Sequence, residues 1–212
     1  MKQELIDKYN VSVPRYTSYP PANFFRPFTG EEYLKEVDYS NEVREKNLSF
    51  YFHMPFCRRL CHYCGCNSYP MAKEERVAEY VQALHKEIDL VAAHLDKSRR
   101  ISQIHYGGGS PTAMPVSVLK ELNEHLLSLF STIEQPEIAI ECHPGYLTSK
   151  DWQGLLDARF NRFSLGIQDF NEDVLRLVNR TPSELPTEEI VAILRSAGVS
   201  LNMDFLFGLP LQ

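Results

Sequence analysis

From residue 48 onward the chain alternates between short apolar segments typical of strands and longer amphipathic segments typical of helices. This alternation requires crossover connections, so the strands are expected to lie parallel in one sheet. We therefore predict an α/β fold built from about five strand–helix steps. The predicted strands cover 48–54, 101–106, 137–141, 162–168 and 199–205, and the predicted helices cover 77–95, 119–129, 149–158, 170–178 and 187–197.

Each of the later predicted strands has one bulky apolar face and one small or polar face, because successive strand residues point to opposite sides. The bulky faces are formed by Ile138 and Ile140, by Phe163, Leu165 and Ile167, and by Val199, Leu201, Met203 and Phe205. The opposite faces are formed by Ala139 and Glu141, by Ser164, Gly166 and Gln168, and by Ser200, Asn202 and Asp204. We expect helices to cover the bulky faces.

The small, polar faces indicate what kind of sheet these strands form. A closed eight-stranded barrel fills its interior with bulky branched side chains. We therefore predict an open or partial (βα)-barrel with room for a ligand. Glu141, Gln168 and Asp204 lie at or near the C-terminal ends of their strands, where such folds place their sites.

The two ends of the chain are expected to differ from this central pattern. Residues 1–47 are rich in Tyr, Pro and charge, and we predict an N-terminal arm with a short helix around 30–37. We predict the α/β domain over 48–212. The last predicted strand runs into a loop with nothing to cover the sheet edge, and exposed edges are usually protected. We therefore expect a fragment of a longer chain, truncated before a last strand and a C-terminal domain, and inactive by itself.

Composition narrows the class of protein further. The net charge of −6 argues against a duplex nucleic-acid partner, which usually requires a basic surface. The polar N-terminus predicts no secretory signal, and the chain has no apolar run long enough to span a membrane. Three of the five cysteines lie within eight residues, which favours a metal or cluster site in a reducing cytoplasm over a disulfide framework.

The clustered cysteines are Cys57, Cys61 and Cys64, in a C-x3-C-x2-C pattern directly after the first predicted strand. Thiolates suit iron–sulfur clusters, zinc and Cu(I). Three thiolates on one loop can bind three irons of a cubane and leave the fourth iron open to a small molecule. A closed zinc site needs a fourth ligand, which His53, His62 or Cys66 could supply. The spacing alone leaves both sites open.

Six segments, taken in order along the chain, resemble one family. They are VPRYTSYP (13–20), YFHMPFCRRLCHYCGCN (51–67), YGGGSPT (106–112), GIQDFN (166–171), VNR (178–180) and NMDFLFGLP (202–210). Together they resemble the oxygen-independent coproporphyrinogen III oxidases (coproporphyrinogen dehydrogenases), which belong to the radical S-adenosylmethionine superfamily. The resemblance covers nearly the whole chain from Val13 onward.

The resemblance implies an oxidoreductase of anaerobic haem biosynthesis that carries a [4Fe–4S] cluster and binds S-adenosylmethionine. In that family, cleavage of S-adenosylmethionine yields a radical that starts the oxidative decarboxylation of two propionates of coproporphyrinogen III. The product is protoporphyrinogen IX, with vinyl groups in their place. An electron donor such as flavodoxin or ferredoxin is implied as a partner, and the full-length protein is expected to be a cytoplasmic monomer without nucleic-acid or membrane partners.

Residues matching family positions are assigned roles by the same resemblance, and no catalytic side chain is among them. Tyr51 matches a contact to the methionine part of S-adenosylmethionine, and Tyr63 matches a contact to its adenine. The metal ligands are Cys57, Cys61 and Cys64. The glycine run that starts at Gly107 contributes two cofactor-binding residues, Gly108 and Gly109. The remaining cofactor-binding residues are Ser110, Glu141, Gln168, Arg180 and Asp204.

Several residues fall outside that assignment. Cys66 matches a cysteine that does not bind the cluster. Cys142 is interpreted as a buried small apolar residue, and His143 stands where the family has an acidic residue before the proline. Arg15 and Tyr16 lie in the arm, and the arginine is a candidate to pair with a substrate propionate.

Three other functions stay open at this point. One is a haem chaperone relative, and another is an anaerobic haem-degrading radical enzyme. The third is a zinc-stabilised α/β module without radical chemistry.

Overall fold

The computed structural model describes residues 3–10, 21–42 and 47–212. Arg15 and Tyr16 lie outside these residues. The chain divides into two compact units, residues 1–36 and 37–212, each described by itself. The domain boundary predicted after residue 47 stays a prediction.

The first unit contains helix α1 (Gln3–Tyr9) and the short 3-10 helix η1 (Ala22–Phe24). Helix α2 (Gly30–Tyr39) begins in this unit and confirms the short helix predicted there. Helix α1 was not predicted. Glu4 in its first turn and Lys8 in its last turn complement the helix dipole, and Gln3 donates a hydrogen bond to Asp7 one turn on.

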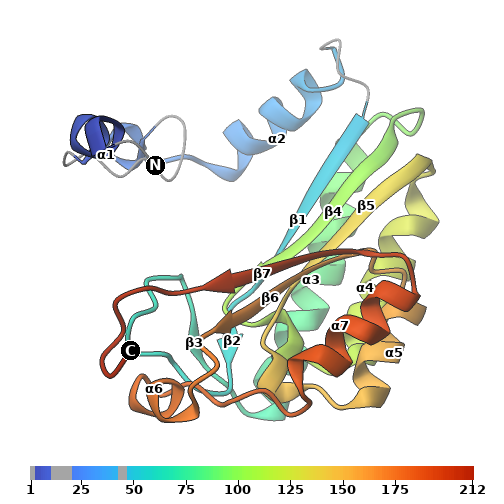
Figure 1. Ribbon diagram of the computed structural model, residues 1–212. Helices are drawn as coiled ribbons and strands as arrows, with labels where there is room; N and C mark the ends of the chain where they lie inside the picture. The colour runs from blue at the N-terminus through green and yellow to red at the C-terminus, as the bar shows by residue number, and fades with distance from the viewer. Residues whose placement is uncertain (1–2, 11–20, 43–46) are drawn as a thin grey trace. The chain divides into compact units, whose positions relative to one another are not determined.

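The second unit is built on a five-stranded parallel sheet with the order β1-β4-β5-β6-β7 (Figure 1). All five predicted strands are confirmed, and the parallel α/β class with them. The strands are β1 (Asn47–Met54), β4 (Arg100–Gly108), β5 (Thr132–Cys142), β6 (Arg162–Gln168) and β7 (Ser200–Phe205).

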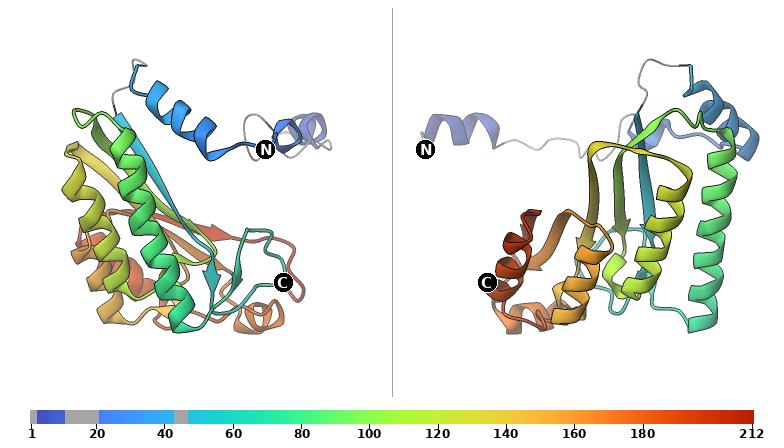
Figure 2. Two further views of the ribbon diagram at one scale, coloured as in Figure 1. Left: turned by 180° about the vertical axis from the view of Figure 1, so that it is seen from behind. Right: turned by 90° about the vertical axis from the view of Figure 1, so that its right-hand side faces the viewer.

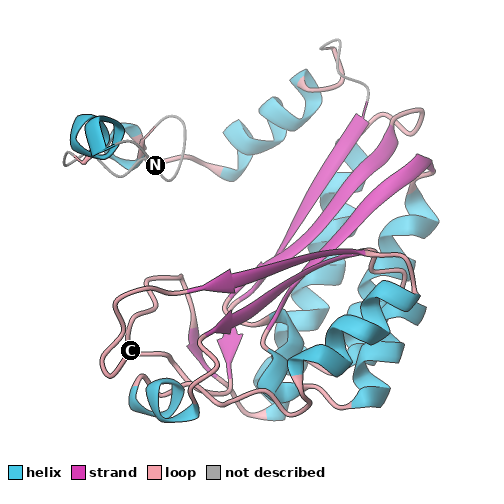
Figure 3. Ribbon diagram, viewed as in Figure 1, coloured by secondary structure: helices cyan, strands magenta, loops and turns pink. Residues whose placement is uncertain are grey.

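Among residues 47–212, the helices cover one face of this sheet and leave its other face without a helix (Figures 2 and 3). The predicted helices are all present, as α3 (Glu74–His94), α4 (Val116–Leu129), α5 (Ser149–Asp157), α6 (Glu172–Leu177) and α7 (Thr187–Ser196). The core lies between the helices and the bulky strand faces. Its fully buried members include Ile101, Ile104, Tyr106, Leu119, Leu122, Leu126, Ile140, Trp152, Leu155 and Phe163.

Strand β7 departs from the predicted pattern on its bulky face. Leu201 packs against the core as expected, but Met203 and Phe205 are exposed. Helix α7 packs near the start of β7, and in the part of the chain that the structure describes no helix follows the strand. The expectation that helices cover the whole bulky face is therefore wrong at these two residues.

Two very short strands were not predicted. They are β2 (Phe56–Cys57) and β3 (Tyr69–Pro70), which pair in parallel and bracket the cysteine loop. No helix in the described ranges combines the length and the apolar character that crossing a membrane requires.

Candidate functional site

A cavity of about 310 Å³ lies at the C-terminal edge of the sheet, against the cysteine loop. It brings together residues that are far apart in the sequence. Eleven of the twelve predicted site residues line it, namely Cys57, Cys61, Tyr63, Cys64, Gly108, Gly109, Ser110, Glu141, Gln168, Arg180 and Asp204. Tyr51 does not.

The cysteine loop is held in place by hydrogen bonds where its two ends meet and in its middle. The amide of Met71 donates to the carbonyl of Cys57 at 2.8 Å, which joins β3 to β2. In the middle of the loop, His62 donates its amide to the Val178 carbonyl at 3.0 Å, and the Asn179 side chain donates to the Leu60 carbonyl at 2.9 Å. The segment after β6 therefore positions the loop, which places Arg180 beside the cysteines.

Arg180 is buried, with 8% of its surface exposed, so the alternative of a solvated arginine at a helix end is wrong. One guanidinium nitrogen, Nη1, lies 3.6 Å from the Sγ of Cys61, and Nη2 donates to the Gly166 carbonyl. Because a guanidinium is always protonated, this contact places a permanent positive charge beside a candidate thiolate.

Two thiols of the loop, Cys57 and Cys66, lie in surroundings that disfavour their negatively charged form. Burial raises the pKa of Cys57, and burial together with the neighbouring Cys64 raises the pKa of Cys66 to about 11. A bound metal ion would lower the pKa of a thiol that coordinates it, because a coordinating thiol loses its proton. All five cysteines are free thiols, so the three predicted ligands are available to a metal.

The donor set fits an iron–sulfur cluster better than a single zinc ion. Within the described ranges, no three His, Cys, Asp or Glu side chains are arranged to hold one metal ion. A cubane does not require that arrangement, because each thiolate binds a different iron. Cys66, offered above as a fourth zinc ligand, is exposed, and its amide donates to the Cys64 Sγ at 3.5 Å.

The glycine run at the end of β4 brings the backbone close to the cavity. Gly108 has a φ of +111°, and a Cβ there would lie 2.6 Å from the His53 ring. A Cβ at Gly109 would lie 2.9 Å from the Pro55 backbone. A side chain at either position would therefore clash, so the sequence needs glycine here for close packing rather than for a simple turn.

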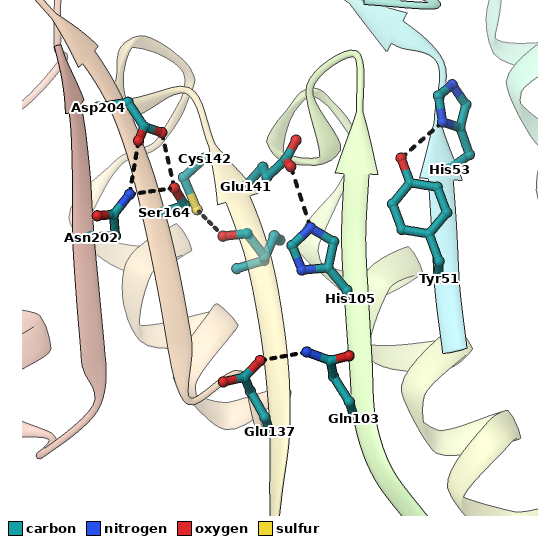
Figure 4. A network of polar contacts seen from close by, with 11 residues as sticks. Tyr51, His53, Gln103, His105, Glu137, Glu141, Cys142, Ser164, Asn202 and Asp204 are labelled. Carbon is teal, nitrogen blue, oxygen red and sulfur yellow. Dashed lines mark hydrogen bonds and ion pairs between the residues drawn. The ribbon is translucent and has the colours of Figure 1, made fainter. Parts of the chain in front are cut away.

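The polar inner face of the sheet forms a network that Figure 4 shows from close by. His105 Nε2 lies 3.3 Å from Glu141 Oε1, and the Tyr51 ring stacks on the His105 ring with centroids 5.8 Å apart. The Tyr51 hydroxyl lies 3.0 Å from His53 Nδ1. Tyr51 lies on the predicted strand face. It is 58% exposed, and it is connected to the cavity through this network rather than by lining it.

A second polar cluster lies on β6 and β7. The Ser164 hydroxyl donates to Asp204 at 3.0 Å, and the Asn202 amide donates to Asp204 at 2.8 Å. Gln168 ends β6 with a φ of +69°, and its side chain also lines the cavity. The polar strand faces predicted from the alternation are therefore confirmed.

His105 and His143 are two site residues to which the sequence had assigned no role. The strand period could have identified His105, since it shares the inner face with Gly107. His143 follows the end of β5 and is 7% exposed; its Nδ1 accepts from the Gly145 amide at 3.2 Å. Burial, and then the charge of Arg180, lower the pKa of His143 to about 3. Cys142 is buried, as predicted.

Comparisons with known proteins agree with this geometry. The family model described as the radical SAM superfamily matches residues 51–212. The chain is 37% identical over 211 residues to the oxygen-independent coproporphyrinogen III oxidase of Synechocystis, covering 99% of this chain and 45% of that protein. It is 40% identical over 213 residues to the enzyme of the same name from Escherichia coli K12, covering 98% and 45% respectively.

A solved structure is also similar to this chain in both fold and sequence. The structure of coproporphyrinogen III oxidase from Escherichia coli, described as a radical SAM enzyme, superposes with a TM-score of 0.83 at 36% sequence identity. The match covers 100% of this chain and 46% of that one. The chain thus spans a little under half the length of the relatives it matches.

Proposed function

Because the chain belongs to the radical SAM superfamily, as the resemblance of its six segments predicted, we propose that it forms the cluster- and cofactor-binding part of an oxygen-independent coproporphyrinogen III oxidase. The observation that carries the proposal is the single cavity shared by the three cysteines, the glycine run and the polar strand ends. The substrate is proposed from the names of the relatives, which are 37% and 40% identical.

In this proposal Cys57, Cys61 and Cys64 hold a [4Fe–4S] cluster and leave one iron for S-adenosylmethionine. When bound, the two groups supply reductive cleavage of the sulfonium and a carbon-centred radical. The protein supplies position and charge. Arg180 places its guanidinium 3.6 Å from Cys61 Sγ, so a permanent positive charge lies beside this proposed ligand.

The other cavity residues are proposed to bind and orient S-adenosylmethionine. Backbone groups at Gly108 and Gly109 can approach its amino group, because no side chain intervenes. Glu141 and Asp204 offer carboxylate acceptors, and each is already oriented, by His105 and by Ser164 respectively. Tyr63 is proposed to pack on the adenine, and Ser110 and Gln168 complete the cavity wall.

The proposal includes coproporphyrinogen III as the substrate, a small one-electron donor such as flavodoxin or ferredoxin, and a monomer in the cytoplasm. Five free thiols support a reducing compartment. Size-exclusion chromatography with light scattering tests the monomer, and a dimer would refute that part of the proposal.

Because the chain spans only part of its relatives, the test of the reaction uses the full-length protein. After anaerobic cluster reconstitution, it is assayed with S-adenosylmethionine, a reductant and coproporphyrinogen III. We expect 5′-deoxyadenosine and protoporphyrinogen IX. Cleavage of S-adenosylmethionine without a porphyrinogen product would refute the substrate. Consumption of haem, in a parallel assay with haem in place of coproporphyrinogen III, would select a haem-degrading enzyme.

A further inference from the structure

His143 is fixed in position by three contacts, two of the ring and one of the backbone. It stacks on the Tyr146 ring with centroids 3.9 Å apart and planes inclined by 11°. Its backbone amide donates to Thr112 Oγ1 at 2.9 Å. Its Nδ1 accepts from the Gly145 amide and therefore carries no proton, so the neutral ring has its hydrogen on Nε2.

That Nε2–H group is buried and meets no acceptor among the described residues. Leaving a buried donor without an acceptor costs about 1–3 kcal/mol. His143 is one of the residues that line the cavity containing the three cysteines. The other buried side-chain atoms without partners belong to His85, Arg99 and Trp152, and none of these residues lines this cavity.

The charges around His143 indicate what kind of ligand this donor would meet. Arg180 lies on the same cavity, and the positive charges of Arg180 and Arg58 both oppose protonation of the ring. Arg58 lies 4.9 Å from the centre of the Tyr146 ring, on which His143 stacks. Of these two arginines only Arg180 lines the cavity, so one permanent positive charge accompanies the His143 donor there and complements an anionic acceptor.

Resting on the proposed function, we infer that the Nε2–H of His143 donates a hydrogen bond to an anionic acceptor of the bound cluster and cofactor. Two groups of the proposed cluster and cofactor would have that chemistry, namely a sulfur of the cluster and the carboxylate of S-adenosylmethionine. A hydrogen bond to a cluster sulfur raises the reduction potential of the cluster. A hydrogen bond to the carboxylate strengthens cofactor binding instead.

Two conservative variants separate this role from the structural role of the ring. His143→Asn keeps an acceptor near the Nδ1 position for the Gly145 amide but does not reach the Nε2 position. His143→Gln keeps an N–H donor near Nε2 and loses the acceptor for Gly145. Trp152→Phe serves as the matched control, because it removes an equally buried, unpartnered N–H group outside the cavity.

The experiment uses the anaerobically reconstituted full-length protein and two readouts, the midpoint potential of the cluster without S-adenosylmethionine and the dissociation constant of S-adenosylmethionine by equilibrium dialysis. If the acceptor is a cluster sulfur, His143→Asn lowers the reduction equilibrium constant about tenfold, or about 59 mV for one electron. If it is the carboxylate, His143→Asn weakens cofactor binding about tenfold and leaves the potential unchanged. His143→Gln should retain most of either property, and Trp152→Phe should change neither.

The inference is overturned if His143→Asn changes neither readout, or if His143→Asn and His143→Gln change them equally. The proposed function is tested separately by the unmodified protein in the same experiment. A protein that holds no cluster refutes the function and the inference together. A cluster that cleaves S-adenosylmethionine normally, in a protein insensitive to both substitutions, refutes the inference alone.

Discussion

Acid should destabilise the folded chain in a way that can be traced to His143. Its pKa is lowered from 6.5 to about 3 in the folded protein, chiefly by burial. The unfolded chain therefore takes up this proton first as the pH falls. The stability that neutral His143 contributes is complete above pH 6.5 and is lost progressively as the pH falls from 6.5 towards 3.

The size of the effect follows from the same values. A pH of 5 is about 1.5 units below the pKa of the histidine in the unfolded chain, so that histidine is protonated, whereas His143 in the folded protein is still neutral. At 1.36 kcal/mol per unit, the free energy of unfolding falls by about 2 kcal/mol between pH 7.5 and pH 5 from this residue alone. Carboxylates add their own pH dependence, so the quantity to measure is the difference between two proteins.

The assay is urea unfolding of the metal-free chain, followed by circular dichroism at constant ionic strength, for the unmodified protein and His143→Asn. The variant lacks the titrating group and keeps an acceptor for Gly145. Its deficit in the free energy of unfolding should shrink by about 2 kcal/mol from pH 7.5 to pH 5. A deficit that stays constant over this range would mean that His143 is not held neutral, and one that grows would mean that the folded state prefers the protonated ring.

Three substitutions test the packing around the site, each by urea unfolding. Gly108→Ala should lower the free energy of unfolding by about 1–3 kcal/mol, because of its positive φ and the clash with His53. Gly65→Ala places no atom within 4 Å of the new Cβ and should lower it far less. Equal losses would contradict the close approach of Gly108 to the His53 ring. Tyr106→Phe removes the donor to Asn123 Oδ1, at 2.9 Å in the core, and should cost about 1–3 kcal/mol; a neutral result would mean that Asn123 finds another partner. Thr148→Ala breaks the capping box of α5 and should cost about 1 kcal/mol, and an unchanged midpoint would show that the cap contributes little.

The sheet and its helices could be predicted because their signal is local. Alternating apolar residues mark β6, and a repeat of three and four marks α3, wherever the rest of the chain lies. The polar inner face followed from the same alternation. Strands β2 and β3 have only two residues each, too few to carry a period. Exposure of Met203 and Phe205 depends on what covers β7, which no local pattern encodes.

The site was predicted less completely, for a related reason. The cysteines, the glycine run and the strand-end carboxylates are identifiable by spacing and by family resemblance. Burial of Arg180 depends on the chain returning to the cysteine loop through Val178 and Asn179, a contact made across more than a hundred residues. The unpartnered donor of His143 arises from ring orientation, which a sequence does not state.

The central claim is that Cys57, Cys61 and Cys64 hold a [4Fe–4S] cluster with one open iron, and it can be tested on this chain directly. The measurement is Mössbauer spectroscopy with iron and sulfide analysis after anaerobic reconstitution, with and without S-adenosylmethionine. We predict a [4Fe–4S] spectrum in which S-adenosylmethionine changes one iron site, abolished by Cys61→Ala and retained in Cys142→Ala. A colourless protein that takes up zinc but no sulfide, or an intact cluster in Cys61→Ala, would contradict the account.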